Sequence, residues 1–461
     1  MDKCAKDSEE VKKIFAKAYE IAYKKTDRRT YQAMEAFVHN LNTMHSRAGA
    51  QVPFSSINFG TDTSPEGRMV IKNYLLSVDA GLGRNETPIF PISIFKVKEG
   101  VNYNKEDKNY DLFRLACEVS AMRLFPNFAF IDAPFNKAFY KEGDINTEVS
   151  YMGCRTRVVA DVTSPDNQVV TGRGNLSFTT INLPRLGIKY GIALGERDKA
   201  DMKGFYEELG ETMDKVRDQL LERFEVQCNK RCYNFPFLLG QGIWTNGEKL
   251  KPTDRLRKVW KHGSLSTGFI GLAECLKALT GKHHGEDPES QKLGLEIIEF
   301  FRHRCDENAK KYNLNFTCLA TPAEGLSGRF TSIDRAIYGK IKGVTDKEYY
   351  TNSFHVPVHY NISITDKLET EAPYHALTNG GHISYIEIDG DVASNVDAFE
   401  RIIRVMKESG IGYGAVNHPV DRDPVCGYVG VINDVCPKCG RKEFEGIPME
   451  RVTSIEDICC E

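Results

Sequence analysis

Two neighbouring stretches carry most of the structural information in this chain: VSYMGCRTRVVADV at residues 149–162 and TGRGNLSFTTINLPRLGI at residues 171–188. Strand-favouring residues, β-branched and aromatic, dominate the segments EVSYMG, RVVADV and NLSFTTINLP. Turn residues dominate the segments MGCRTR and TGRGN. The pattern predicts consecutive strands with a single cysteine, Cys154, on the turn between the first two, where Gly153 and Arg155 flank it.

Cys154 is a candidate for chemistry because a thiol on a tight loop can point into a cavity. There it acts as a nucleophile, a metal ligand or a radical carrier. A buried, inert thiol is the commoner state of a free cysteine. The neighbouring residues contain no Cys–His pair, so an ordinary thiol nucleophile is poorly supported.

The rest of the chain alternates helical and strand-like patterns. The first fifty residues predict two helices, the second capped by Asp27, and residues 201–226 predict a longer one. Near the C-terminus HISYIEID and IGYGAV predict strands on either side of a helix that Ser394 caps and Gly410 ends. The alternation predicts an α/β fold with at least partly parallel strands.

Bulk properties exclude some classes of function. A formal net charge of −3 over 461 residues argues against a nucleic-acid partner. No apolar run is long enough for a membrane helix, and the first residues lack a signal-peptide core, so we expect a cytoplasmic protein without a membrane partner. The thirteen cysteines then indicate metal binding or thiol chemistry before disulfides.

Two further motifs suggest ligand sites. ATPAEGLSGRF at residues 320–330 combines Gly325 and Gly328 with Arg329, and we expect a Gly-rich loop there whose N–H groups hold phosphates, although such loops usually only turn the chain. CPKCG, with Cys436 and Cys439, is a strong zinc-knuckle element because a CxxC turn points both thiolates at one ion. Cysteine turns without a metal are the alternative.

Five stretches, in this order, resemble the class III (anaerobic) ribonucleotide reductases: TMHSRAGAQVPFSSINFGTDTSPEGR, YMGCRTR, GRGNLSFTTINLPRLGI, ATPAEGLSGRF and NGGHISYIEIDG. The resemblance runs from about residue 26 to residue 453. It implies part of a ten-stranded α/β barrel over residues 1–416 and a small zinc-ribbon-like tail over residues 417–461. It also implies reduction of ribonucleoside triphosphates to deoxyribonucleotides, which supplies DNA precursors.

The resemblance assigns roles to individual residues. Cys154 matches the finger-loop cysteine that becomes a thiyl radical, and Met152 matches the thioether beside the substrate. Asn175, twenty-one residues after Cys154, matches the asparagine that binds the substrate ribose. The tail implies a Zn²⁺ site with Cys426, Cys436 and Cys439, in which Asp423 stands where the family has a cysteine. A Cys₃Asp site, weakened binding, or a fourth ligand from Cys459 or Cys460 all stay open.

Two departures from the family separate the hypotheses about function. The family's glycyl radical lies in a motif like RVTGY, and this chain has Ser454 at that position. Gly427, in VCGYVG, is a weaker alternative radical position. The N-terminal ATP-binding cone and the early barrel strands find no match, so we expect an N-terminal truncation. The chain is then either a radical reductase or an inactive fragment or paralogue that binds nucleotides without turnover. A pyruvate formate-lyase type enzyme ranks third because Cys154 has no adjacent cysteine.

The resemblance also implies partners and cofactors. An iron–sulfur, S-adenosylmethionine-dependent activating enzyme would generate the glycyl radical, and formate or a thioredoxin-type protein would supply electrons. We further expect nucleotide effectors such as ATP, and a homodimer.

Overall fold

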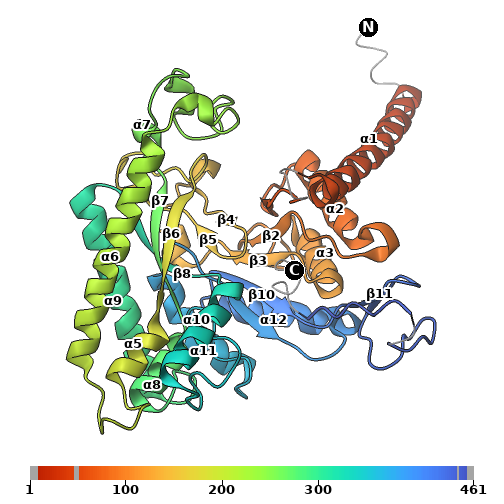
Figure 1. Ribbon diagram of the computed structural model, residues 1–461. Helices are drawn as coiled ribbons and strands as arrows, with labels where there is room; N and C mark the ends of the chain where they lie inside the picture. Colours follow the sequence, from red (N-terminus) through yellow and green to blue (C-terminus); the bar gives the residue numbers. More distant parts are fainter. Residues whose placement is uncertain (1–8, 46–50, 444–445, 454–461) are drawn as a thin grey trace.

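The computed structural model describes residues 9–45, 51–443 and 446–453 and has an α/β architecture (Figure 1). Its helices are α1 (Glu9–Thr43), α2 (Pro65–Ala80), α3 (Tyr110–Arg123), α4 (Pro134–Lys137), α5 (Leu183–Tyr190), α6 (Met202–Cys228), α7 (Arg257–Trp260), α8 (Leu272–Thr280), α9 (Pro288–Tyr312), α10 (Glu324–Tyr338), α11 (Ile364–Leu377) and α12 (Val396–Glu408). Its strands are β1 (Ser56–Phe59), β2 (Ile92–Val97), β3 (Asn127–Phe130), β4 (Tyr151–Met152), β5 (Thr156–Arg157), β6 (Asn175–Asn182), β7 (Ser264–Ile270), β8 (Asn315–Ala320), β9 (Ser384–Glu387), β10 (Tyr413–Asn417), β11 (Asp421–Asp423) and β12 (Tyr428–Gly430).

Two sheets form the framework. One has the order β1-β2-β3-β10-β9, and the other has the order β6-β7-β8 with all its pairs parallel. In the first, only the β3–β10 pair is antiparallel. Gly381, just before β9, bridges to Leu319 of β8 and to Thr156 of β5, which links the two sheets to each other and to the β4–β5 hairpin. The partly parallel α/β architecture predicted from the sequence is confirmed.

The central strands of both sheets are buried, whereas β1 and β6, at the sheet edges, are only partly buried. Strand β2 is buried along its whole length, as expected for a parallel strand between two apolar layers. Its residues Phe95 and Val97 pack outward with α2, α3 and α12, whereas Ile92 and Ile94 pack inward. The inner cluster also contains Tyr151 of the β4–β5 hairpin. The hairpin therefore lies in the interior formed by the strands (Figure 1).

Helix α6 confirms the helix predicted near residues 201–226. Asp201 caps it by accepting a hydrogen bond from the Gly204 amide. The predicted apolar stripe is buried against the three-stranded sheet, and its members are Phe205, Leu209, Met213, Val216, Leu220 and Phe224.

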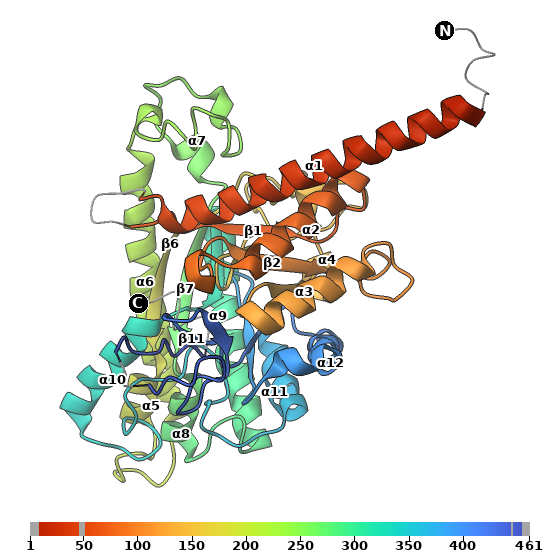
Figure 2. The ribbon, with the colours of Figure 1, turned by 90° about the vertical axis from the view of Figure 1, so that its right-hand side faces the viewer.

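Two helix predictions are wrong, and of the predicted strand RVVADV only Arg157 lies in a strand, β5. Residues 9–43 form one long helix, α1, which continues through Asp27, and Figure 2 shows its N-terminal half extending away from the body. Asp27 accepts a hydrogen bond from the side-chain amide of Asn73 on α2 (2.8 Å) instead of capping a second helix. Asn395, not Ser394, caps α12 through the Ala398 amide. The predicted β-α-β unit itself is present, with β9 and β10 parallel.

In the part of the chain that the structure describes, no helix has the length and apolar character needed to span a membrane.

Candidate functional site

Cys154 lies on the three-residue turn that joins β4 to β5, as the sequence predicts. The short hairpin pairs Tyr151 with Arg157 and Met152 with Thr156. Gly153 adopts a φ of +59°, and a side chain there would bring a Cβ atom within 3.2 Å of the Phe54 ring. The turn therefore requires glycine next to the cysteine.

Side chains from both edges of the hairpin fix the position of this turn. The Asn58 amide group pairs with the backbone of Tyr151, donating at 2.8 Å and accepting at 3.1 Å, in the manner of a strand neighbour. The Gly153 amide donates to the Ser56 hydroxyl at 3.2 Å. The Tyr413 hydroxyl donates to the Gly153 carbonyl at 3.1 Å. Gly153, the residue before Cys154, is thus held from two strands of the larger sheet.

The two arginines of MGCRTR are buried, although the sequence gave no role to either. Arg155 is 1% exposed and donates to the Ser353 hydroxyl (3.0 Å) and to Nε2 of His355 (3.4 Å). Arg157 is 2% exposed and binds the side chain of Asn136. A buried cation is costly unless it is paired, so these contacts are part of what places the turn. The signal in the sequence that could have identified them is the pair of arginines that closely follows Cys154.

Cys154 differs from the other cysteines of the framework. It is half-buried and packs at the edge of the inner cluster, whereas Cys228 and Cys305 are buried among apolar helices. Burial raises the pKa of the Cys228 thiol to about 11 and that of the Cys305 thiol to about 12. Those thiols stay protonated and inert, which leaves Cys154 as the framework's accessible candidate.

Met152 and Asn175 come from different parts of the fold. Met152 is half-buried in β4, two residues before Cys154. Asn175 is the first residue of β6, and its side-chain amide donates to the hydroxyls of Ser264 (3.1 Å) and Ser266 (2.5 Å) on β7. Those contacts orient its side chain on the smaller sheet. The cavity that Cys154, Met152 and Asn175 are expected to share stays a prediction.

Residues 320–330 do not form the Gly-rich loop that we expected. Strand β8 ends at Ala320 and α10 begins at Glu324, so Gly325, Gly328 and Arg329 lie in the first two turns of a helix. A Cβ atom at Gly325 would meet open space, so this glycine marks an exposed helix start and not a tight turn. An α-helix N-terminus still presents free N–H groups to an anion.

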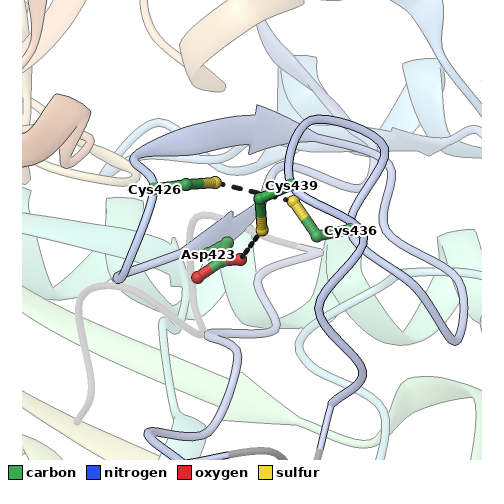
Figure 3. A group of neighbouring side chains, drawn as sticks. All are labelled: Asp423, Cys426, Cys436 and Cys439. Atoms are coloured by element: carbon green, nitrogen blue, oxygen red, sulfur yellow. Dashed lines mark hydrogen bonds between the residues drawn. The ribbon is translucent and has the colours of Figure 1, made fainter.

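The four predicted metal-binding residues of the tail converge (Figure 3). One ligand atom each from Asp423, Cys426, Cys436 and Cys439 lies within 4.8 Å of all the others. The sulfurs of Cys426 and Cys436 are 3.6 Å apart, and the Cys439 sulfur is 3.3 Å from Oδ2 of Asp423. Tetrahedral Zn²⁺ with bonds of about 2.3 Å separates its sulfurs by about 3.8 Å. Three thiols and a carboxylate in this geometry fit a zinc ion.

Arg441 holds the carboxylate of this cluster. Its Nη2 donates to Oδ1 of Asp423 at 2.7 Å and its Nε to Oδ2 at 3.3 Å. The hydrogen bond from Arg441 keeps the pKa of Asp423 well below its usual range. A bond from the Arg441 backbone amide lowers the pKa of the Cys439 thiol, but burial and the contact with Asp423 raise it, to about 11.

The two predicted radical positions differ in what can be said of them. Ser454, together with Cys459 and Cys460, lies outside the described residues. Gly427 lies on the turn between β11 and β12 with a φ of +70°, next to Arg84. Its carbonyl accepts a hydrogen bond from the Asn85 side chain at 3.2 Å.

A basic cleft between α1, α2 and α3 was missed by the sequence analysis. It has a volume of about 230 Å³, and Arg68, Lys72 and Lys108 line it together with Tyr23 and Asp111. Arg68 donates to Asp111 at 2.7 Å, which orients the guanidinium at the cleft. Arg68 and Lys72 lie on α2 and Lys108 lies just before α3, so no local sequence motif predicts the cleft.

Comparisons with known proteins decide the family. A family model for anaerobic ribonucleoside-triphosphate reductases matches residues 5–454. This chain belongs to that family. It is similar to the anaerobic ribonucleoside-triphosphate reductase of Enterobacteria phage T4, with 35% identity over 93% of this chain and 68% of that protein. The Escherichia coli enzyme of the same name is 32% identical over 93% of this chain and 59% of its own length. The chain therefore spans about three fifths to two thirds of these relatives.

The fold agrees with this family. The anaerobic ribonucleotide reductase of Thermotoga maritima, solved in complex with dATP and CTP, superposes with a TM-score of 0.63 at 15% identity, covering 91% of this chain and 65% of that one. The family and the α/β fold class predicted from the sequence are confirmed.

Proposed function

We propose that this chain carries the catalytic site of a radical oxidoreductase that reduces ribonucleoside triphosphates to deoxyribonucleoside triphosphates. The observation that carries the proposal is the fixed turn of Cys154 inside the strand framework, in a chain of this family. The overall reaction removes the 2′-hydroxyl as water and consumes two electrons and two protons. Formate or a thioredoxin-type protein would supply the electrons.

Three residues of the chain would act on or beside the substrate ribose. Cys154, as a thiyl radical, would take the hydrogen from C3′ and later return it. Asn175 would bind a ribose hydroxyl through its uncharged amide, which does not compete for the proton. Met152 would provide a polarisable contact beside the sugar. The interior position of the hairpin would keep water away from radical intermediates.

The phosphates would bind at the start of α10. Helix α10 begins four residues after the end of β8, its first turn has free N–H groups, and Gly325 leaves room for close approach of an anion. Gly328 and Arg329 follow on the same helix, and Arg329 is exposed and can pair with a phosphate. We assign the basic cleft at Arg68, Lys72 and Lys108 to a nucleotide effector, whose phosphates would compete with Asp111 for Arg68 and with Asp27 for Lys72, and whose base would lie beside Tyr23.

The tail would bind Zn²⁺ through Cys426, Cys436, Cys439 and Asp423, and the ion would hold residues 417–453 in place. The family's activating enzyme, an iron–sulfur protein that uses S-adenosylmethionine, would be the partner that generates the radical. A second copy of this chain would pack on α1, whose N-terminal half exposes Ile14, Phe15 and Tyr19.

Ser454 supports a second candidate function, nucleotide binding without turnover. A glycyl radical is delocalised along the peptide, and serine adds a side chain at that position. Gly427 is the alternative radical position. It lies in a turn with a φ of +70°, and its carbonyl accepts a hydrogen bond from the Asn85 side chain.

The deciding experiment combines electron paramagnetic resonance with a product assay under anaerobiosis. The chain is mixed with the activating enzyme, S-adenosylmethionine, formate and a ribonucleoside triphosphate. We expect no glycyl doublet from the native chain, a doublet and deoxyribonucleotide from Ser454→Gly, and a doublet without product from Ser454→Gly with Cys154→Ser. A doublet from the native chain that disappears in Gly427→Ala would assign the radical to Gly427. A Ser454→Gly chain that carries the doublet and binds nucleotide, but forms no product, would reject the proposed function.

A further inference from the structure

A buried polar chain runs from the residue after Cys154 into the centre of the molecule. Arg155 donates from Nη1 to Nε2 of His355 at 3.4 Å, and Nδ1 of His355 lies 3.4 Å from Oε2 of Glu371. Glu371 is fully buried on α11, and His355 is 7% exposed. One imidazole ring, that of His355, thus connects the buried Arg155 guanidinium to the buried Glu371 carboxylate.

The partners of Glu371 determine which atom donates in each hydrogen bond that joins Glu371, His355 and Arg155. Oε1 accepts from the Val356 amide at 3.0 Å, and Oε2 accepts from the Ser384 hydroxyl at 2.6 Å. An ionised carboxylate only accepts, so the proton between Glu371 and His355 lies on Nδ1 of the histidine. Nε2 is then a lone pair that accepts from Arg155. The carboxylate therefore selects the histidine tautomer that binds the arginine.

The ionised state of Glu371 is itself supported by its surroundings. Burial raises its pKa, but the charge of Lys367 and the hydrogen bonds from His355 and Ser384 lower it, to about 2. The Lys367 ammonium binds the Tyr385 carbonyl at 2.7 Å and Glu387 at 2.6 Å, which keeps it beside the helix. Glu371 is thus a permanent negative charge at neutral pH.

The other arm of the Glu371 cluster reaches the strand behind the turn. Ser384 gives its proton to Glu371, so its oxygen accepts from Nε2 of His375 at 3.0 Å. Nδ1 of His375 in turn accepts from the Gly412 amide at 3.1 Å, at the start of β10. Strand β10 also carries Tyr413, which binds the Gly153 carbonyl. Glu371 therefore connects to the residues on both sides of Cys154.

The segment that presents His355 is shaped for this contact. Ser353 has a φ of +42°, a left-handed conformation that is unfavourable for serine, and its hydroxyl accepts from Arg155 at 3.0 Å. Strain of this kind persists only where surrounding contacts determine the backbone.

We propose that Glu371 is a positioning residue for Cys154, acting through His355 on Arg155. The inference rests on the proposed role of Cys154, and nothing else so far assigns Glu371 a function. A neutral amide at position 371 would turn its NH₂ group towards His355, shift the ring proton to Nε2 and leave two donors facing each other at Arg155. The turn would then lose one of the contacts that fix it on the C-terminal side of Cys154, while the Arg155 bond to Ser353 remains.

The test measures how well the turn protects the Cys154 thiol, and it requires no catalytic activity. The rate of alkylation of Cys154 by iodoacetamide is followed by mass spectrometry of its peptide, in the native full-length chain, in Glu371→Gln and in Glu387→Gln. The last variant is the matched control, because it removes a carboxylate from the same helix–sheet contact without touching His355. We expect alkylation about tenfold faster in Glu371→Gln and within twofold of native in Glu387→Gln.

A double variant separates positioning from general loosening. Arg155→Met should also speed alkylation, and adding Glu371→Gln to it should change little further, because the two act along one path. Unchanged alkylation in Glu371→Gln, or additive effects in the double variant, would overturn the proposal. If Glu371→Gln does not fold, His355→Phe replaces it, because it removes the imidazole between Glu371 and Arg155. We expect a severalfold increase in the alkylation rate, and no increase would overturn the proposal. A chain that forms no product yet loses Cys154 protection in Glu371→Gln rejects the proposed function and keeps this inference.

Discussion

The hydroxyl of Tyr413 lies 3.1 Å from the carbonyl oxygen of Gly153 and donates a hydrogen bond to it, across 260 residues of sequence. Asn127 donates to the same hydroxyl at 2.9 Å, so the proton of Tyr413 is directed at Gly153. One phenol on β10 thereby fixes the peptide bond that enters Cys154.

Removing that phenol oxygen should destabilise the chain. We expect Tyr413→Phe to lower the free energy of unfolding by about 1–3 kcal/mol, because it leaves a buried carbonyl and the Asn127 amide without their partner. Urea denaturation followed by circular dichroism measures the change. Tyr349→Phe, at a tyrosine that is 60% exposed, is the control and should stay within about 0.5 kcal/mol. Equal midpoints for the two variants would contradict the assigned hydrogen bond.

The metal cluster should depend on its buried cysteine. Cys436→Ser should abolish stoichiometric zinc, as measured by plasma mass spectrometry of the purified protein, and should make residues 417–453 the first segment cut in limited proteolysis. Cys154→Ser is the control because its thiol belongs to the other site, and it should keep its zinc. Zinc retained in Cys436→Ser, or absent from the native chain, would show that the four residues converge for another reason.

Arg441 should tune the affinity of the same cluster for zinc. Its two bonds to Asp423 orient the carboxylate towards the sulfurs, and loss of such an outer contact weakens metal binding about 10–100-fold. Competition with a chromogenic chelator should show this loss in Arg441→Gln. Lys438→Gln, which alters a neighbouring cation bonded only to the Cys426 carbonyl, should leave the affinity nearly unchanged. Equal affinities in both variants would remove Arg441 from the site.

Acid should destabilise the fold through His284. Burial, with a smaller effect of His283, lowers the pKa of His284 from 6.5 to about 4. Its Nε2 donates to the Phe354 carbonyl at 2.8 Å. The unfolded chain binds a proton below about pH 6.5, whereas the folded chain does not until about pH 4. The stabilisation is therefore complete above pH 6.5 and is lost as the pH falls towards 4, by about 3 kcal/mol.

Urea midpoints at pH 7.5 and pH 4.5 measure this loss. In His284→Gln the side-chain amide can still donate to Phe354 but no longer titrates, so the pH dependence should shrink by about 3 kcal/mol. Identical pH dependence in the variant and the native chain would show that His284 is not held neutral.

The exposed face of α1 should control self-association. Ile14, Phe15 and Tyr19 are each more than 60% exposed, and a contiguous apolar face of this kind usually meets a partner. Light scattering after size-exclusion chromatography should show a dimer for the native chain and a monomer for Phe15→Glu. Lys17→Glu, on the same helix but not part of that apolar group, should remain dimeric. A native chain that is monomeric at all concentrations would contradict the assignment.

Local patterns in the sequence predicted the elements whose determinants lie close together in the chain. The strand–turn–strand around Cys154, the stripe of α6 and the β-α-β unit near the C-terminus each follow from spacing within about thirty residues. The metal cluster is equally local, because Asp423 and Cys439 are only sixteen residues apart.

Contacts between distant segments explain what the sequence could not predict. Asp27 looks like a helix cap, but its partner Asn73 belongs to the next helix. Residues 320–330 look like a loop because of their glycines, yet they continue from a strand into α10. The buried chain from Arg155 through His355 to Glu371 joins residues 200 and 16 positions apart, and no periodicity connects them.

The presence of Asp423 among the thiols of the tail changes how the protein is oxidised by dioxygen. The sulfurs of Cys426 and Cys436 are 3.6 Å apart, so dioxygen acting on the metal-free cluster would close them into a disulfide. Four cysteines would pair off completely, but among the described residues of this cluster Asp423 cannot be oxidised, so Cys439 is left over as an exposed thiol. That thiol is free to form a covalent bridge to another chain. With a fourth cysteine, oxidation would form two disulfides within one molecule. With Asp423 in its place, oxidation leaves a thiol that can form a disulfide with a second molecule.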